Sequence, residues 1–222
     1  MVQDGLRIVY LDLDVHHGDG VEAVFYDTDQ VLTISIHQHG HTLFPGTGFP
    51  EEMGQGAGRG FAVNVPLAPG TDDDLYFWVF KETVPALVSA FDPDVLVTQL
   101  GVDTFTTDPL AALNLTNEGF CKLIREIKSW GLQWVALGGG GYNIMNVARA
   151  WTSAWAIMKG VELSDDLPGD FVIKHRHLLG KNLKLSEKAP LISSVNRESV
   201  QRARQLAGSV VSWIKENIFP IV

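Results

Sequence analysis

Cysteine is almost absent from this sequence of 222 residues, in which Cys121 is the only one. A single thiol excludes a disulfide within the chain and a zinc site built from several thiolates. Any metal ion would therefore be held by histidine and carboxylate side chains. Such sparing use of cysteine is typical of a reducing compartment, and we expect a cytoplasmic location.

Long apolar runs and an excess of positive charge are also missing. No apolar stretch reaches the roughly 18 residues that a membrane span needs, and the start of the chain lacks the pattern of a signal peptide. The 17 basic and 26 acidic residues give a net charge of −9, which argues against non-specific binding to nucleic acid or anionic lipid. We therefore expect neither a nucleic-acid nor a membrane partner.

Short apolar, β-branched segments alternate with amphipathic ones along the chain. Strands are expected at residues 7–13, 31–36, 61–65, 95–100 and 134–137. Helices are expected at residues 21–25, 71–91, 116–130, 144–159 and 196–217. Pro66 should stop the third strand, and Pro85 should kink or break the second helix. Residues 163–194 are expected to form an irregular excursion within a single domain over 1–222. This alternation predicts a layered α/β fold with a parallel sheet.

Chemically active side chains collect where the expected strands end. Asp14 and His16 are two residues apart on an extended segment and so share one face. Asp103 follows the fourth expected strand and Tyr142 the fifth. Open parallel sheets place their sites beyond the carboxyl ends of the strands. Two carboxylates and one imidazole would there make an open zinc site with a position left for water.

Each of these features, taken alone, has a simpler explanation. An Asp-x-His pair is common, and Asp103 could cap a helix or turn. The run Gly138–Gly141 could cradle a phosphate or only form a tight turn. It fails the dinucleotide fingerprint because Asn143 stands at the third glycine position, and it lacks the ending of a P-loop. An isolated tyrosine such as Tyr142 is usually just half-buried.

Four motifs taken together resemble a known family. They are Asp12-Leu-Asp-Val-His-His-Gly-Asp-Gly20, Phe44-Pro-Gly-Thr-Gly48, Gln99-Leu-Gly-Val-Asp103 and Leu137-Gly-Gly-Gly-Gly-Tyr142. In order and spacing they resemble the zinc-dependent histone deacetylases, most closely the bacterial acetoin-utilization-type members. The resemblance runs from about residue 5 to residue 160 and implies the arginase/deacetylase fold, a three-layer α/β arrangement around a parallel sheet.

The resemblance implies an activity and a set of site residues. The activity would be hydrolysis of the amide of acetyl-lysine in a protein, or of a small acetylated amine. Asp14, His16 and Asp103 match the zinc ligands, although ferrous iron suits the same ligands. Tyr142 matches the tyrosine that hydrogen-bonds the acyl carbonyl. Phe44 matches a wall, and Gly140 the floor, of the acyl-lysine tunnel.

The resemblance also implies two structural sites for K⁺ or Na⁺. The residues that match the first site, near the zinc, are Asp12, Asp14, His16, Ser35 and Ile36. The residues that match part of the second, more remote site are Phe25, Thr28 and Val31.

One part of the family pattern has no counterpart here. The family places a pair of adjacent histidines, its general base and acid, before the first expected strand of this chain. We therefore expect the N-terminal part of the domain to be absent. Asp12 and Asp19, which match the carboxylates that orient this pair, would lack their partners. An exposed sheet edge would then favour a homo-oligomer or binding of the missing half.

The other histidines have less direct roles, and two other functions compete with hydrolysis of an acetyl amide. His17 should point away from His16, and the run His37–His41 has a loop or rim role or, less readily, takes part in proton transfer. A two-manganese ureohydrolase is disfavoured because Gly18 stands where its motif Asp-x-His-x-Asp needs a second aspartate. A non-catalytic fragment that contributes half a site is the remaining alternative.

Overall fold

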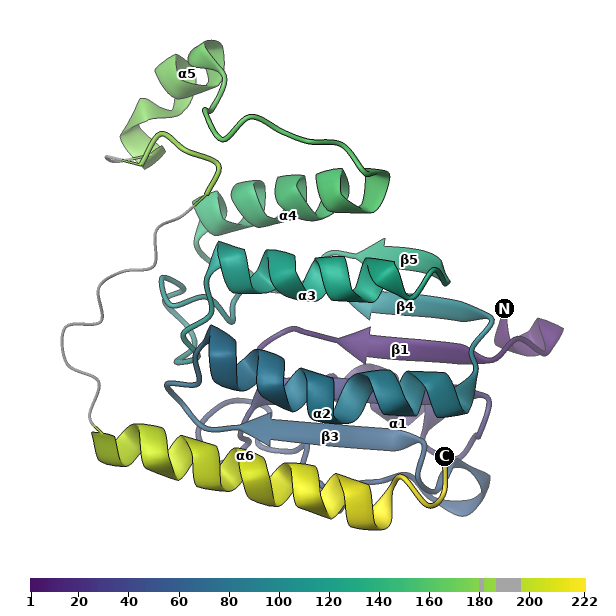
Figure 1. Cartoon of the computed structure of the whole chain (residues 1–222). Coiled ribbons are helices and arrows are strands. Elements are labelled where there is room, and N and C mark those ends of the chain that lie inside the picture. The colour runs from purple at the N-terminus through teal and green to yellow at the C-terminus, as the bar shows by residue number, and fades with distance from the viewer. Residues whose placement is uncertain (180–181, 187–196) are drawn as a thin grey trace.

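The centre of the molecule is a parallel β-sheet, seen in Figure 1 in a computed structural model that describes residues 1–179, 182–186 and 197–222. The described residues form five strands in the order β3-β2-β1-β4-β5. These strands are β1 (Ile8–Asp12), β2 (Val31–Gln38), β3 (Ala62–Leu67), β4 (Val95–Gln99) and β5 (Gln133–Leu137). All neighbouring pairs are parallel, so the predicted parallel sheet is confirmed.

Strand β2 extends two residues further than the sequence predicts. It includes His37 and Gln38, and all eight of its residues are buried. His37 was expected in a loop, but it lies in this buried strand. Its burial could not be predicted from the sequence, because a buried strand is identified by its apolar residues and the side chain of His37 is polar.

Strand β3 does not stop before Pro66, so that prediction is wrong. Pro66 pairs with His37 in the register of β3 and β2. The carbonyls of Phe61 and Leu67 accept hydrogen bonds from N–H groups of β2 and of the residue that follows it. Successive residues of a strand point their backbone groups to opposite sides, so the nitrogen of Pro66 points to the free edge of the sheet. A proline at that position on an edge strand removes no hydrogen bond from the sheet.

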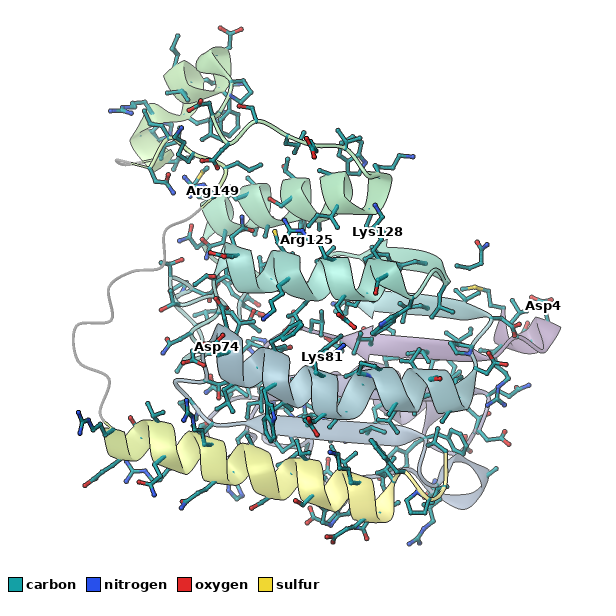
Figure 2. All side chains as sticks on the ribbon, in the orientation of Figure 1. Asp4, Asp74, Lys81, Arg125, Lys128 and Arg149 are labelled. Atoms are coloured by element: carbon teal, nitrogen blue, oxygen red, sulfur yellow. The ribbon has the colours of Figure 1, made fainter. Side chains whose placement is uncertain are left out.

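Helices cover the sheet and connect its strands. They are α1 (Asp19–Phe25), α2 (Asp73–Phe91), α3 (Asn117–Ser129), α4 (Ile144–Lys159), α5 (Gly169–Leu179) and α6 (Arg197–Asn217). Figure 1 shows α2 and α3 in front of the sheet and α1 behind it. On α2, Lys81 (labelled in Figure 2) lies 2.6 Å from Glu126 of α3, which links the two neighbouring helices.

The expectation at Pro85 was a kink or a break, and helix α2 continues through this residue without a break. A proline cannot donate a hydrogen bond to the carbonyl four residues earlier, here that of Lys81. Because Lys81 is exposed, water can take the place of that missing donor. The buried face of α2 includes Phe80, Leu87 and Phe91, and these apolar side chains hold the helix on the sheet.

The described residues of the C-terminal part form the two helices α5 and α6. On α6, Ala207, Val210, Val211 and Ile214 are buried along one side, so this helix is amphipathic, as expected. Its expected first residue, 196, lies outside the described residues, as do residues 180–181 and 187–194 of the expected excursion. No helix in the described part is long and apolar enough to cross a membrane.

An irregular excursion was expected at residues 163–194, but part of its described portion is helical. Helix α5 lies within it and has non-helical backbone angles at His175. Arg149 of α4, labelled in Figure 2, donates hydrogen bonds to the carbonyls of Asn182 and Lys184. This contact fastens the segment 182–186 to α4.

Candidate metal centre

The order of the strands brings the predicted metal ligands together. β1 lies between β2 and β4, and β4 lies next to β5. The segment after β1 carries Asp14 and His16, and the segment after β4 carries Asp103. In Figure 1 the arrows of β1, β4 and β5 point the same way, so these segments leave the sheet at one edge. This is where an open parallel sheet places its site.

Three side chains meet at this edge of the sheet. Nδ1 of His16 lies 3.0 Å from Oδ1 of Asp14 and 3.1 Å from Oδ2 of Asp103. Asp103 is fully buried and His16 is half-buried. The three groups offer one nitrogen and two oxygens within 4.8 Å of one another, so the structure brings together the ligand set that the resemblance implies.

Main-chain donors hold the two carboxylates in place. Oδ2 of Asp14 accepts from the Gly140 N–H at 2.6 Å, and Oδ1 of Asp103 accepts from the Val15 N–H at 2.9 Å. Among the described residues, Oδ2 of Asp103 accepts no hydrogen bond of good geometry, although His16 Nδ1 lies 3.1 Å away. A buried carboxylate oxygen without such a bond is costly, and it is the atom that faces His16.

A single proton on His16 cannot bridge both carboxylates of this cluster. Its contacts with Asp103 and Asp14 raise the pKa of the imidazole to about 10. A proton on Nδ1 can form a good hydrogen bond to only one of the two carboxylates. A divalent cation that accepts both nitrogen and oxygen ligands could be coordinated by all three groups at once. The residues present therefore fit a metal ion.

Glycines allow the three segments to approach this closely. A Cβ atom at Gly140 would lie 1.9 Å from Oδ2 of Asp103, and one at Gly101 would lie 2.3 Å from Oδ2 of Asp14. Any larger residue would displace a carboxylate. Within the run Gly138–Gly141, Gly140 thus lets the backbone approach the two carboxylates closely.

Tyr142 lies beside the cluster and is open to solvent. The backbone N–H of Tyr142 donates to Oδ2 of Asp108 at 2.8 Å, and Tyr142 is 55% exposed. Burial and the charges of Asp103 and Asp14 raise the pKa of the phenol, so it keeps its proton at neutral pH. Phe44 is 78% exposed and follows in the loop after β2. The position of Asp108 under Tyr142 was not predicted.

Asp12 is buried next to the cluster, whereas Asp19 is exposed at the start of α1. Burial raises the pKa of Asp12 to about 7. A Cβ atom at Gly18 would lie 2.5 Å from its Oδ2, so the loop packs tightly on this carboxyl group. A hollow of about 300 Å³ has both aspartates in its lining.

The residues of the two expected monovalent-cation sites lie at opposite ends of β2. Asp12 pairs with Ser35 in the register of β1 and β2, beside Asp14, His16 and Ile36. Val31 begins β2, and Phe25 ends α1. Thr28 N–H donates to the Phe25 carbonyl. The structure thus places each set within one region, and the ions themselves remain predictions.

His17 turns away from His16, as expected, and enters a second polar cluster. Its Nε2 lies 3.0 Å from Oε2 of Glu22 and its Nδ1 lies 2.8 Å from Oγ1 of Thr47. His37 packs against it with ring centroids 4.9 Å apart. Burial and the neighbouring His17 lower the pKa of His37 to about 3, which does not suit it to proton transfer. Sequence reasoning missed this cluster, although the spacing from His17 to Glu22 was visible.

His39 and His41 lie in the loop after β2 with their rings 4.8 Å apart. Both rings also contact Phe49. This small aromatic group fits the loop role that the sequence favoured for them.

Comparison with known proteins identifies the family. A model of the histone deacetylase domain matches residues 2–158. The chain belongs to the histone deacetylase family. Among similar deacetylases, histone deacetylase clr6 of Schizosaccharomyces pombe is 40% identical over 96% of this chain and 50% of its own length. Human histone deacetylase 1 is 44% identical over 73% of this chain and 33% of its own length. This family member therefore spans about half the length, or less, of these relatives.

Solved structures of the family have the same fold. An HDAC homolog from Aquifex aeolicus matches with a TM-score of 0.78 and 33% identity, over 93% of this chain and 59% of that one. An HDAC homolog complexed with SAHA matches with a TM-score of 0.77 and 32% identity, with the same coverage. The predicted arginase/deacetylase fold is confirmed. The predicted likeness to acetoin-utilization-type members is not tested by these matches and stays a prediction.

Proposed function

We propose that this chain carries the metal-binding half of a deacetylase site and hydrolyses the amide of acetyl-lysine or of a related acetylated amine. The observation that carries the proposal is the meeting of His16 Nδ1 with Asp14 and Asp103 at 3.0 and 3.1 Å. The Asp103 oxygen at this point is buried and accepts no hydrogen bond of good geometry in the described part of the chain. Membership of the histone deacetylase family supports the reaction class.

Asp14, His16 and Asp103 would hold a divalent ion, which we take to be Zn²⁺, with Fe²⁺ as the alternative. When bound, such an ion supplies Lewis acidity toward an acyl oxygen and toward water. K⁺ or Na⁺ would occupy the two structural sites near β2. We further propose a cytoplasmic location and an acetylated protein or small acetylated amine as substrate.

The remaining residues have roles in binding and orientation. The Tyr142 hydroxyl donates a hydrogen bond to the acyl oxygen, and its raised pKa keeps that proton in place. Such a donor contributes most when negative charge develops on the oxygen, and its loss typically costs about 10²–10³ in rate. Phe44 offers an exposed ring to the lysine chain. Gly140 leaves space that a side chain would fill.

A second candidate function is metal binding without turnover. Among the described residues, His16 is the one histidine in the cluster with Asp14 and Asp103. His17 and His37 are held in other hydrogen bonds. Neither His17 nor His37 is thus free to act as a general base, a group worth about 10²–10⁴ in rate.

An assay of the purified chain on an acetyl-lysine peptide, with and without Zn²⁺, tests the proposal. We expect weak zinc-dependent release of acetate that Asp103→Ala abolishes and Tyr142→Phe lowers by about 10²–10³. Tyr26→Phe serves as the matched control and should not change the rate. Zinc binding without acetate release would favour the second candidate. Failure to bind zinc at all would refute both.

A further inference from the structure

Asp108 is a buried carboxylate that is not among the residues of the proposed function. It lies in the loop after β4 that also carries the candidate ligand Asp103, and it is only 7% exposed. In the described part of the chain, no lysine or arginine forms an ion pair with it. Burying a carboxylate costs several kcal/mol unless its charge is compensated. Hydrogen-bond donors must therefore stabilise the charge of Asp108.

Two backbone N–H groups are these donors. Oδ1 of Asp108 accepts from the Leu110 N–H at 3.0 Å, within the same loop. Oδ2 accepts from the Tyr142 N–H at 2.8 Å, in the loop that joins β5 to α4. Hydrogen bonds to an ionised acceptor are roughly twice as strong as those between neutral groups. One carboxylate thus fastens two loops together, and the second loop carries the phenol.

The loop of residues 138–143 is held by a carboxylate at each of two points. The Gly140 N–H donates to Asp14 at 2.6 Å, which fixes the middle of the loop relative to the candidate metal centre. Two residues later, the Tyr142 N–H donates to Asp108. Because Tyr142 is 55% exposed, packing does little to fix its ring. The position of the phenol therefore depends strongly on how its backbone is held.

Side chains next to this contact reinforce it. Oγ1 of Thr107 lies 2.9 Å from Nδ2 and 3.1 Å from Oδ1 of Asn146 in α4, and Asn146 is 1% exposed. Nδ2 of Asn143 donates to the Thr107 carbonyl at 3.4 Å. These contacts tie the loop after β4 to the start of α4, so they flank Tyr142 on the side away from β5.

We propose that Asp108 is a positioning residue for Tyr142. The inference rests on the proposed function, in which the Tyr142 hydroxyl donates to the acyl oxygen. Asp108 holds the backbone of Tyr142 at a set place beside Asp103 and His16, so the phenol is in position before charge develops on that oxygen. A misplacement of about 1 Å can cost about 10²-fold in rate. Since Asp108 is not one of the three candidate ligands, it should affect turnover and not zinc affinity.

Hydrogen exchange of the Tyr142 N–H tests the contact without an assay of activity. The chain has four tyrosines, so labelling with ¹⁵N-tyrosine gives four amide signals, and Tyr142→Phe identifies the one that belongs to Tyr142. We expect this amide to exchange about 10-fold faster, or more, in Asp108→Ala. The other three signals should keep their positions, which shows that the variant is folded.

Asn114→Ala is the matched control for this measurement. It removes the hydrogen bond from the Thr106 hydroxyl to Asn114 and so loosens the same loop without touching Asp108. Exchange at Tyr142 should stay as in the original chain. Equal exchange of the Tyr142 N–H in Asp108→Ala and in the original chain would overturn the proposal.

Kinetics of the zinc-loaded chain on an acetyl-lysine peptide test the consequence for the reaction. Asp108→Ala should lower kcat by about 10- to 100-fold and change KM by less than about 2-fold. Asp108→Asn keeps an oxygen that can accept from the Tyr142 N–H and should recover part of the loss. In the Tyr142→Phe chain, Asp108→Ala should cause no further loss, because the group that it positions is already gone. An equal loss in both backgrounds would indicate a merely structural role and overturn the proposal.

Zinc-dependent turnover separates this role from the proposed function itself. An unchanged kcat in Asp108→Ala, with a lowered one in Tyr142→Phe, would refute the positioning role and leave the proposed function standing. A zinc-loaded chain that releases no acetate would refute the proposed hydrolysis and the positioning role with it. The exchange rates would still show whether Asp108 holds the backbone of Tyr142.

Discussion

Glycine at two positions decides how closely the loops approach the carboxylates of the candidate metal centre. At Gly140 and Gly101, an added Cβ would collide with Asp103 and Asp14. At Gly20 of α1, by contrast, nothing in the described part of the chain lies within 4 Å of an added Cβ. The same residue type therefore has different consequences at two places near one site.

Gly140→Ala should weaken zinc binding by about 10- to 100-fold, because the displaced Asp103 can no longer point at His16. Gly20→Ala is the matched control and should leave zinc affinity unchanged, with stability equal or raised by up to about 1 kcal/mol. Competition titration with a zinc-binding dye measures both. Equal affinities of the two variants would contradict the close-approach role of Gly140.

His37 makes the stability of the metal-free chain depend on pH. Burial lowers its pKa to about 3, below the ordinary value of about 6.5. As pH falls below 6.5, the unfolded chain binds a proton that the folded chain does not. The free energy of unfolding should therefore fall by about 1.4 kcal/mol per pH unit from this residue.

Urea titrations at pH 6.5, 6.0 and 5.5 measure this slope. His37→Gln should be less stable at pH 6.5, because it loses the hydrogen bond to the Gly48 carbonyl. Its free energy of unfolding should also lack the fall of about 1.4 kcal/mol per pH unit that His37 contributes, so its slope should differ from that of the original chain by this amount. His41→Gln, in the exposed loop, should keep the slope of the original chain. Parallel slopes in all three proteins would contradict the assignment to His37.

Among the elements, helix α3 depends on a cap shared with α2. Oγ1 of Thr116 accepts from the Gly119 N–H and donates to Oδ2 of Asp73 at 2.6 Å. Thr116→Ala should lower the free energy of unfolding by about 1–2 kcal/mol, since it removes the cap and the link between the helices. Ser129→Ala, near the exposed end of α3, should cost less than about 0.5 kcal/mol. Chemical denaturation compares the two, and equal losses would contradict the role of Thr116.

The sequence predicted most elements because their apolar residues repeat at strand or helix periods. It failed where polar residues or proline sit in strands, as at His37 in β2 and Pro66 in β3, since burial and edge position depend on neighbouring strands. It also missed α5, whose sole buried residue is Leu179. A helix with so little apolar surface leaves a weak pattern.

The candidate metal centre was predictable because Asp14, His16 and Asp103 each follow a strand and match a family motif. The contact between Asp108 and Tyr142 was not, since both residues lie in loops without a periodic pattern and are distant in sequence. Only the pairing of β4 with β5 brings these loops together.

At the scale of the whole molecule, β5 leaves an apolar surface open. It pairs with β4 alone among the described strands, and its Val135 and Leu137 are 42% and 44% exposed. These two residues lie on one face, because strand side chains alternate. An open edge with such side chains favours pairing with another chain.

We therefore predict concentration-dependent self-association of the chain, measured by sedimentation velocity. Val135→Lys should shift the distribution toward monomer, because a charged side chain on the edge strand opposes pairing. Ile173→Lys, at the 79% exposed Ile173 of α5, should leave it unchanged. A monomer at every concentration would contradict the prediction.

X-ray diffraction from zinc-loaded crystals, collected above and below the zinc absorption edge, tests the central claim most directly. The account predicts an anomalous peak in contact with Oδ1 or Oδ2 of Asp14, Nδ1 of His16 and Oδ2 of Asp103, and no such peak in Asp103→Ala crystals. Loaded crystals with zinc bound elsewhere and none among these three side chains would contradict it.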